Sequence, residues 1–165
     1  MRIEILLPRD RNRYGDLSLI SEPDKGVKLP EQRLLHFPCF GKADNQGAAD
    51  HGNPTRDPLK PFGDTPLGDY VGTVVRFADG QIKDHDTLRK YGPYGYIVLT
   101  AVAGDALKAQ DAGRFGLLIH GGDPGLNGIL RPTFGCIRLA NAHIAGLLGY
   151  CRAGEHLRVS MREAA

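Results

Sequence analysis

The chain has 165 residues, enough for one domain with a hydrophobic core and short for two, so we expect a single domain over residues 1–165. Hydrophobic residues make up 41% and charged residues 24%, as in an ordinary globular protein, while 22 glycines and 11 prolines favour many turns and short strands. The formal net charge is only +2 and the basic residues are scattered among acidic ones, which argues against nucleic-acid binding.

Short strands are predicted through the N-terminal half. Apolar and β-branched residues predict strands over 2–7, 17–20, 27–29, 33–40 and 71–77, with turns at 23–26 and 79–80. Pro38 lies at a sheet edge or ends its strand, because proline cannot donate a hydrogen bond to a neighbouring strand. Residues 41–63 have no periodicity and predict a long polar loop, which in a compact domain is typically a lid or a mobile insertion.

The C-terminal half is predicted to alternate strands with helices. Residues 94–103 predict a central strand, 104–113 a short helix capped by Asp105, and 115–119 a buried strand that ends at His120. Asn141 is expected to cap a second helix, and residues 156–160 predict the last strand. About eight short strands with one or two peripheral helices indicate a mainly β fold, a sandwich or a barrel.

Three further features of the sequence limit the possible functions. The cysteines, Cys39, Cys136 and Cys151, are odd in number, so a disulfide framework is not expected. The apolar run at 5–7 is too short for a signal-peptide core, and no later stretch is long enough to span a bilayer. The histidines have no spacing typical of a metal site. We therefore expect no Sec-type signal, no membrane anchor and no metal.

A histidine and a cysteine that lie close together in the sequence are the candidates for catalysis. A thiol is mostly protonated at neutral pH, whereas attack on an acyl carbon needs the thiolate. His120 can accept the proton of Cys136 and return it to the departing amine, and the carbonyl of Gly121 can fix the tautomer of the ring. A buried structural role is the alternative for Cys136, but a glycine before it and an arginine two residues later argue against a core position.

The residues around this pair predict how a substrate is held. The free backbone of Gly135 lets the N–H groups of Gly135 and Cys136 point to an oxyanion. Arg138 suits a substrate carboxylate because its planar guanidinium can bind both oxygens, although it could also face solvent. Thr133 either contacts the substrate or orders its own loop, and Tyr94 either lines the pocket or packs within its strand.

These residues resemble the signature of a known enzyme family. His120-Gly121, followed by Thr133-x-Gly135-Cys136-Ile137-Arg138-Leu139, is similar to the motif of bacterial L,D-transpeptidases of the YkuD type. The resemblance extends upstream to Thr65-Pro66-Leu67-Gly68-Asp69-Tyr70 and to Gly92-Pro93-Tyr94, and it covers roughly residues 64–142. It implies the β-sandwich or barrel of that family.

The resemblance also implies an activity and a substrate. Enzymes of this family attack the carbonyl of the residue before the terminal D-amino acid of a peptidoglycan tetrapeptide stem and form a thioester. An amine from a second stem then gives a cross-link, water gives L,D-carboxypeptidase activity, and a free D-amino acid gives exchange. Peptidoglycan stem peptides are thus the expected partners, and no metal or organic cofactor is implied.

Phe134 departs from the family pattern, in which a histidine commonly precedes the motif glycine. Phenylalanine can neither donate a hydrogen bond nor transfer a proton, although it can pack against a substrate side chain. A non-catalytic peptidoglycan-binding module with a degenerate site is therefore the alternative to an active enzyme.

The family acts on the cell wall, which implies a site of action in the periplasm. Without a Sec-type signal, we expect delivery by another secretion route or cytoplasmic synthesis before export. The family includes antibacterial toxins, so a secreted effector that interacts with secretion machinery or an immunity protein is a further hypothesis.

Overall fold

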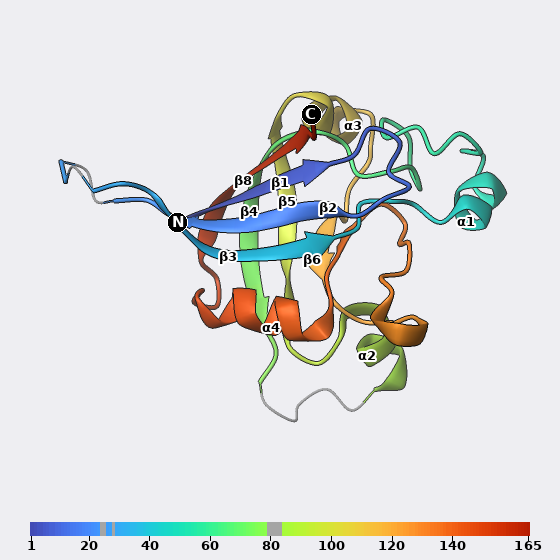
Figure 1. Cartoon of the computed structure of the whole chain (residues 1–165). Coiled ribbons are helices and arrows are strands. Elements are labelled where there is room, and N and C mark those ends of the chain that lie inside the picture. The colour runs from blue at the N-terminus through green and yellow to red at the C-terminus, as the bar shows by residue number, and fades with distance from the viewer. Residues whose placement is uncertain (24–25, 28, 79–83) are drawn as a thin grey trace.

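The computed structural model describes residues 1–23, 26–27, 29–78 and 84–165 (Figure 1). The predicted turn at 79–80 lies outside the described residues, and the turn at 23–26 and the strand at 27–29 lie partly outside them. The described residues form eight strands: β1 (Arg2–Leu7), β2 (Gly15–Ser21), β3 (Gln32–Cys39), β4 (Gly68–Arg76), β5 (Gly95–Ala103), β6 (Leu118–His120), β7 (Ile137–Arg138) and β8 (His156–Glu163). These strands make one sheet in the order β3-β2-β1-β8-β4-β5-β6-β7.

The sheet curls until its two edge strands nearly meet. The pairs β1–β8 and β6–β7 are parallel, and the other neighbours are antiparallel. Phe40, just after β3, exchanges two main-chain hydrogen bonds of 3.0 and 2.9 Å with Arg138 of β7. This bridge links the first strand of the order to the last and makes the sheet a nearly closed, mixed barrel. The predicted mainly β fold is confirmed.

Most of the strand predictions hold, but β7 was not predicted and two predicted strands need correction. Strand β1 has the predicted bounds, and Pro38 lies on β3, an edge strand, as expected. The hairpin partner of β2 is β3, and Val27 and Leu29, the described residues of the strand predicted at 27–29, are exposed and belong to no strand. The strand predicted at 115–119 begins only at Leu118, since Gly116 has a φ of +80° that interrupts the extended backbone.

The described residues also form four short α-helices and one 3₁₀ turn. These are α1 (Asn45–Asp50), α2 (His85–Tyr91), α3 (Asp105–Asp111), η1 (Leu126–Gly128) and α4 (Asn141–Gly149). The sequence predicted α3 and α4 but neither α1 nor α2. None of the described helices is both long enough and apolar enough to cross a membrane.

Both predicted helix caps are displaced by one residue. Gly104 and Ala140 occupy the N-cap positions, and Asp105 and Asn141 are the first residues of their helices. The side chain of Asn141 accepts a hydrogen bond of 2.7 Å from the N–H of Gly122. It therefore ties α4 to the segment after β6 instead of capping its own helix.

The predicted loop at 41–63 contains α1 and is ordered by side-chain bonds to the backbone. The Asp44 carboxylate caps α1 by accepting from the N–H of Gly47 at 2.7 Å. Farther along, the Asn53 amide donates to the carbonyl of Asp57 at 3.0 Å and accepts from its N–H at 2.8 Å. Because polar side chains and not an apolar stripe order this segment, its sequence has no hydrophobic period, and α1 was not predicted.

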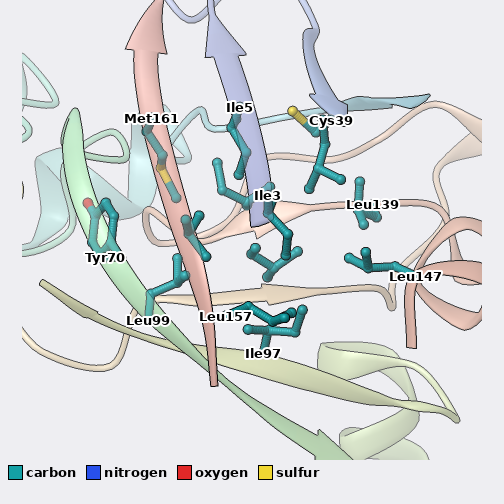
Figure 2. Packing of buried hydrophobic residues seen from close by; sticks show 14 of the residues in the cluster. Ile3, Ile5, Cys39, Tyr70, Ile97, Leu99, Leu139, Leu147, Leu157 and Met161 are labelled. Atoms are coloured by element: carbon teal, nitrogen blue, oxygen red, sulfur yellow. The ribbon is translucent and has the colours of Figure 1, made fainter. Parts of the chain in front are cut away.

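Alternate strand residues fill the inside of the barrel (Figure 2). Ile3 and Ile5 of β1 pack with Leu157 and Met161 of β8, and Leu147 of α4 closes one side of the same cluster. All five are buried, and each aliphatic side chain of this size contributes about 1.5–3 kcal/mol when fully buried. The packed interior thus holds the strands in place for the side chains that they carry on the outer face of the barrel.

Candidate active site

The short parallel strands β6 and β7 bring the predicted catalytic residues together. Ile119 of β6 is the register partner of Ile137 of β7, and both side chains are completely buried in the core. Because side chains alternate along a strand, those of His120, Cys136 and Arg138 lie on the opposite face. All three line one cavity of about 810 Å³.

The imidazole of His120 is buried and neutral. Its Nδ1 lies 2.7 Å from the carbonyl oxygen of Gly121, and a carbonyl can only accept, so in the neutral ring Nδ1 carries the proton and Nε2 carries the lone pair of a base. Burial, followed by the charge of Arg138, lowers the pKa of His120 to about 4, and the carbonyls of Gly121 and Lys90 partly oppose this. The ring of Tyr91 packs edge-on against it, with centroids 5.6 Å apart.

The thiol of Cys136 lies in the same cavity and is partly exposed. Its Sγ is 3.7 Å from the carbonyl oxygen of Gly116. Burial raises the pKa of Cys136, and the backbone of Leu118 and the guanidinium groups of Arg138 and Arg114 act in the opposite direction. The two arginines thus favour the thiolate in a position where desolvation disfavours it.

The two groups share the cavity without a hydrogen bond between them. No hydrogen bond joins His120 to Cys136 among the residues that the structure describes. Catalytic hydrogen bonds are often long in a free enzyme and tighten when substrate is bound. The arrangement can offer a proton acceptor and a nucleophile to one bound carbonyl group.

Two threonines hold the loop that carries the cysteine. The hydroxyl of Thr133 donates to the carbonyl of Cys136 at 2.9 Å and accepts from the N–H of Gly135 at 3.0 Å. The hydroxyl of Thr65 donates to the carbonyl of Gly135 at 2.7 Å. The Gly135 N–H is therefore not directed at an oxyanion, contrary to the prediction. Within the described part of the chain, the Cys136 N–H has no acceptor, so it remains the candidate donor.

Arg138 forms part of the cavity wall and does not face solvent. It is 6% exposed, and it donates from Nη1 to the carbonyl of Gly121 at 2.9 Å and from Nε to that of Arg131 at 3.3 Å. Burial lowers its pKa, although a guanidinium stays charged at all ordinary pH values. Its Nη2 donates to no described residue, and the role in carboxylate binding stays a prediction.

The segment 41–63 supplies another wall of the cavity. Phe134 is 58% exposed, and its ring lies edge-on to that of Phe62, with centroids 5.4 Å apart. His51 stacks on Phe62 at 3.8 Å, and a Cβ on Gly47 would press against the Phe134 ring. Phe134 thus joins the loop of the nucleophile to this segment, and both line the cavity.

Tyr94 does not line the cavity, and Tyr91 does. Helix α2, which the sequence did not predict, carries Tyr91 to the edge of His120. Gly92 then ends the helix with a φ of +78°, and the next residues lead into β5. Of the two roles left open for Tyr94, lining the cavity is thus not observed, and Tyr91 was not considered because α2 was not predicted.

Thr65 and Arg114 are two further site residues to which the sequence analysis gave no role. Thr65 is the first residue of the family-like motif at 65–70, and this motif is the signal that could have identified it. Arg114 stands between glycines and a phenylalanine and offers no pattern that would identify it. Within the described residues, no three His, Cys, Asp or Glu side chains are grouped as a metal site.

Known structures share this fold at low sequence identity. A protein of Bdellovibrio bacteriovorus, Bd1075, is 19% identical with a TM-score of 0.57, and the match covers 98% of this chain and 48% of that one. The helical cell shape determining protein Pgp2 of Campylobacter jejuni is 20% identical with a TM-score of 0.54, over 99% of this chain and 48% of that one. L,D-transpeptidase 1 of Mycobacterium tuberculosis is more distant, at 13% identity, 99% and 62% coverage and a TM-score of 0.41.

No family model and no curated protein sequence matches the chain. The chain spans about half the length of the first two structures that it matches. With Bd1075 and Pgp2, it shares a fold, at a sequence identity too low to transfer an activity by itself.

Proposed function

We propose that the protein is a cysteine acyl-transferase that acts on peptidoglycan tetrapeptide stems, as an L,D-transpeptidase, an L,D-carboxypeptidase or a D-amino-acid exchange enzyme. The observation that carries this proposal is the shared cavity of Cys136 and His120, in which Gly121 holds the imidazole in the tautomer of a base. The motif around Cys136 supplies the substrate class. One protein of the same fold, Pgp2, is described as determining helical cell shape, which agrees with an action on the wall.

The first half of the reaction forms a thioester. Nε2 of His120 accepts the Sγ proton of Cys136, and the sulfur attacks the carbonyl carbon before the terminal D-amino acid. The Cys136 N–H donates to the oxyanion. The C–N bond then breaks, His120 returns the proton to the leaving amine, and a free D-amino acid departs.

The second half regenerates the thiol. An acceptor amine, a water molecule or a free D-amino acid attacks the thioester carbon, and His120 takes its proton. The C–S bond breaks, and the sulfur of Cys136 regains that proton from the imidazolium. The acceptor decides between cross-linking, hydrolysis and exchange.

The charge of the cavity suits a stem peptide that carries free carboxylates. Five cationic side chains line it against two acidic ones: Arg89, Lys90, Arg114, Arg131 and Arg138 against Asp44 and Asp123. The unused Nη2 of Arg138 is the donor that we assign to a substrate carboxylate. Phe134 offers an apolar wall to a substrate side chain.

This function places the site of action at the cell wall or in the periplasm. We propose a single catalytic domain over residues 1–165 and, as a further hypothesis, the role of a secreted effector. Expression directed to the periplasm and to the cytoplasm of a bacterial host tests both the compartment and the chemistry. Toxicity only in the periplasm, lost in Cys136→Ala, is the expected result.

The biochemical test uses purified protein and disaccharide-tetrapeptides, with products followed by mass spectrometry. Wild type should release the terminal D-amino acid, and Cys136→Ala should not. The ratio of tripeptide, exchanged tetrapeptide and dimer identifies the acceptor. Equal product profiles for wild type and Cys136→Ala would rule the proposal out, and saturable binding without product or thioester would identify a non-catalytic peptidoglycan-binding module.

A further inference from the structure

A second buried arginine, Arg114, stands beside the nucleophile loop. Its side chain is 5% exposed and donates to three main-chain carbonyls, those of Pro58, Gly63 (2.6 Å) and Asp64 (2.8 Å). No carboxylate of the described residues lies within salt-bridge distance of it. Burial lowers the pKa of Arg114, and the charges of Asp64 and Asp57 partly oppose this. A guanidinium remains charged, so a fixed cation with no salt bridge to the described residues is enclosed here.

Arg114 packs directly against the residue that precedes the nucleophile. A Cβ on Gly135 would collide with Nη2 of Arg114, so only glycine lets the guanidinium approach this closely. Arg114 and Cys136 line the same cavity, and Sγ lies 3.7 Å from the carbonyl of Gly116, two residues after Arg114. The cation therefore lies against the nucleophile loop on a segment other than the one that carries Arg138.

The guanidinium also joins the wall segment to the nucleophile loop. Its three carbonyl acceptors all belong to residues 58–64, whose neighbour Thr65 holds the carbonyl of Gly135. A group fixed by several hydrogen bonds keeps its charge in one place, so it can stabilise a nearby anion without reorganisation. Removing the guanidinium would remove its hydrogen bonds to residues 58–64 as well as its charge.

We propose that Arg114 is a positioning residue that holds a fixed positive charge beside Cys136 and favours the thiolate form of the nucleophile. The inference depends on the proposed function only for the role of Cys136 as nucleophile. It adds a residue from outside the Cys136 motif to the machinery. Arg138 supplies a second charge, and the two act together on the same sulfur.

Other charged or titratable groups from the remaining elements line the same cavity as the thiol. Besides His120 and Arg138, the cavity is lined by Asp44, Arg89, Lys90, Tyr91, Asp123 and Arg131. These groups are unchanged in all variants below, so a difference between variants reports on Arg114.

The test measures alkylation of Cys136 by iodoacetamide as a function of pH, read at the Cys136 peptide by mass spectrometry. Arg114→Gln should move the pH midpoint of alkylation upward by about one unit or more, because it removes a nearby opposite charge. Arg114→Lys should move it by less than half as much. Arg11→Gln is the matched control, since Arg11 is equally buried, donates to the Pro8 carbonyl and is not a cavity residue, and it should leave the midpoint unchanged.

Folding of each variant is checked by circular dichroism. A folded Arg114→Gln variant with the wild-type midpoint would overturn the proposal, as would equal shifts in Arg114→Gln and Arg114→Lys. If Arg114→Gln does not fold, wild-type NMR decides. The guanidinium N–H resonances of Arg114 should shift as Cys136 ionises and should stay still in Cys136→Ser, whereas no movement in wild type overturns the proposal.

Alkylation uses no peptidoglycan, so the two proposals fail separately. Loss of the proposed substrate would leave the effect of Arg114 on the thiol intact. An unchanged midpoint in Arg114→Gln would leave the release of the D-amino acid by wild type unaffected.

Discussion

His120 and Arg138 are register partners on β6 and β7 and donate to the same acceptor, the carbonyl oxygen of Gly121. The distances are 2.7 Å from His120 Nδ1 and 2.9 Å from Arg138 Nη1. The shared carbonyl fixes the tautomer of the ring and also brings a buried cation close to it. Burial and, after it, this cation lower the pKa of His120 and keep the ring neutral, as a general base requires.

Replacing Arg138 should raise the pKa of His120. Burial and then the Arg138 charge lower this pKa to about 4, so Arg138→Gln leaves burial as the main remaining cause. We expect the midpoint to rise by roughly one pH unit, measured by NMR titration of the His120 ring. Arg131→Gln, which removes an exposed cation of the same cavity, serves as the control and should move the midpoint less. An unmoved midpoint in Arg138→Gln would show that Arg138 does not act on the ring.

His120 should also make the protein less stable in mild acid. Its pKa is depressed from 6.5 to about 4 in the folded state, so the unfolded chain takes up the proton first. The stabilising contribution is complete above about pH 6.5 and is lost as the pH falls towards 4. It amounts to about 3 kcal/mol at 1.36 kcal/mol per pKa unit. Urea unfolding between pH 7.5 and 4.5 should show this loss, and His120→Gln should reduce it.

Much of the fold could be predicted from sequence because the strands carry their own signal. The apolar and β-branched residues at 2–7 identified β1, and the proline at 38 identified the edge strand. Helices α1 and α2 were missed because they are short and mostly solvent-facing: α2 has no buried residue and α1 has only Ala48. Such helices depend on caps and lack an apolar stripe.

The site was predictable where residues are close in sequence and not where the fold assembles it. His120, Gly121 and Cys136 were predicted from one motif. His120 and Cys136 line the cavity, and the Gly121 carbonyl accepts from His120. The contact of Arg114 with Gly135 joins residues from separate segments, and no local pattern reports it. The role of Thr133 was left open, and its two bonds favour ordering of the loop.

Thr133 provides a test of the nucleophile loop. Thr133→Val removes the donor to the Cys136 carbonyl and the acceptor for the Gly135 N–H but keeps the shape of the side chain. We expect a loss of about 1–3 kcal/mol in the free energy of unfolding. Release of the D-amino acid should slow by at least about tenfold, since small misplacements of a reacting group are costly. Thr133→Ser keeps the hydroxyl and should remain near wild type in both urea unfolding and product release; a Thr133→Val variant of normal activity would contradict this role.

Phe134 should influence substrate binding far more than stability or chemistry. The side chain is 58% exposed and lies edge-on to Phe62 and His51, so Phe134→Ala should cost at most about 1 kcal/mol of unfolding free energy. An apolar wall that binds substrate and transition state alike affects KM and not kcat. Steady-state kinetics on tetrapeptide stems should therefore show KM raised by roughly tenfold, with kcat nearly unchanged. Phe134→Leu keeps much of the apolar surface and should show a smaller rise. A large fall in kcat with an unchanged KM would instead mean that the Phe134 ring positions the reacting groups.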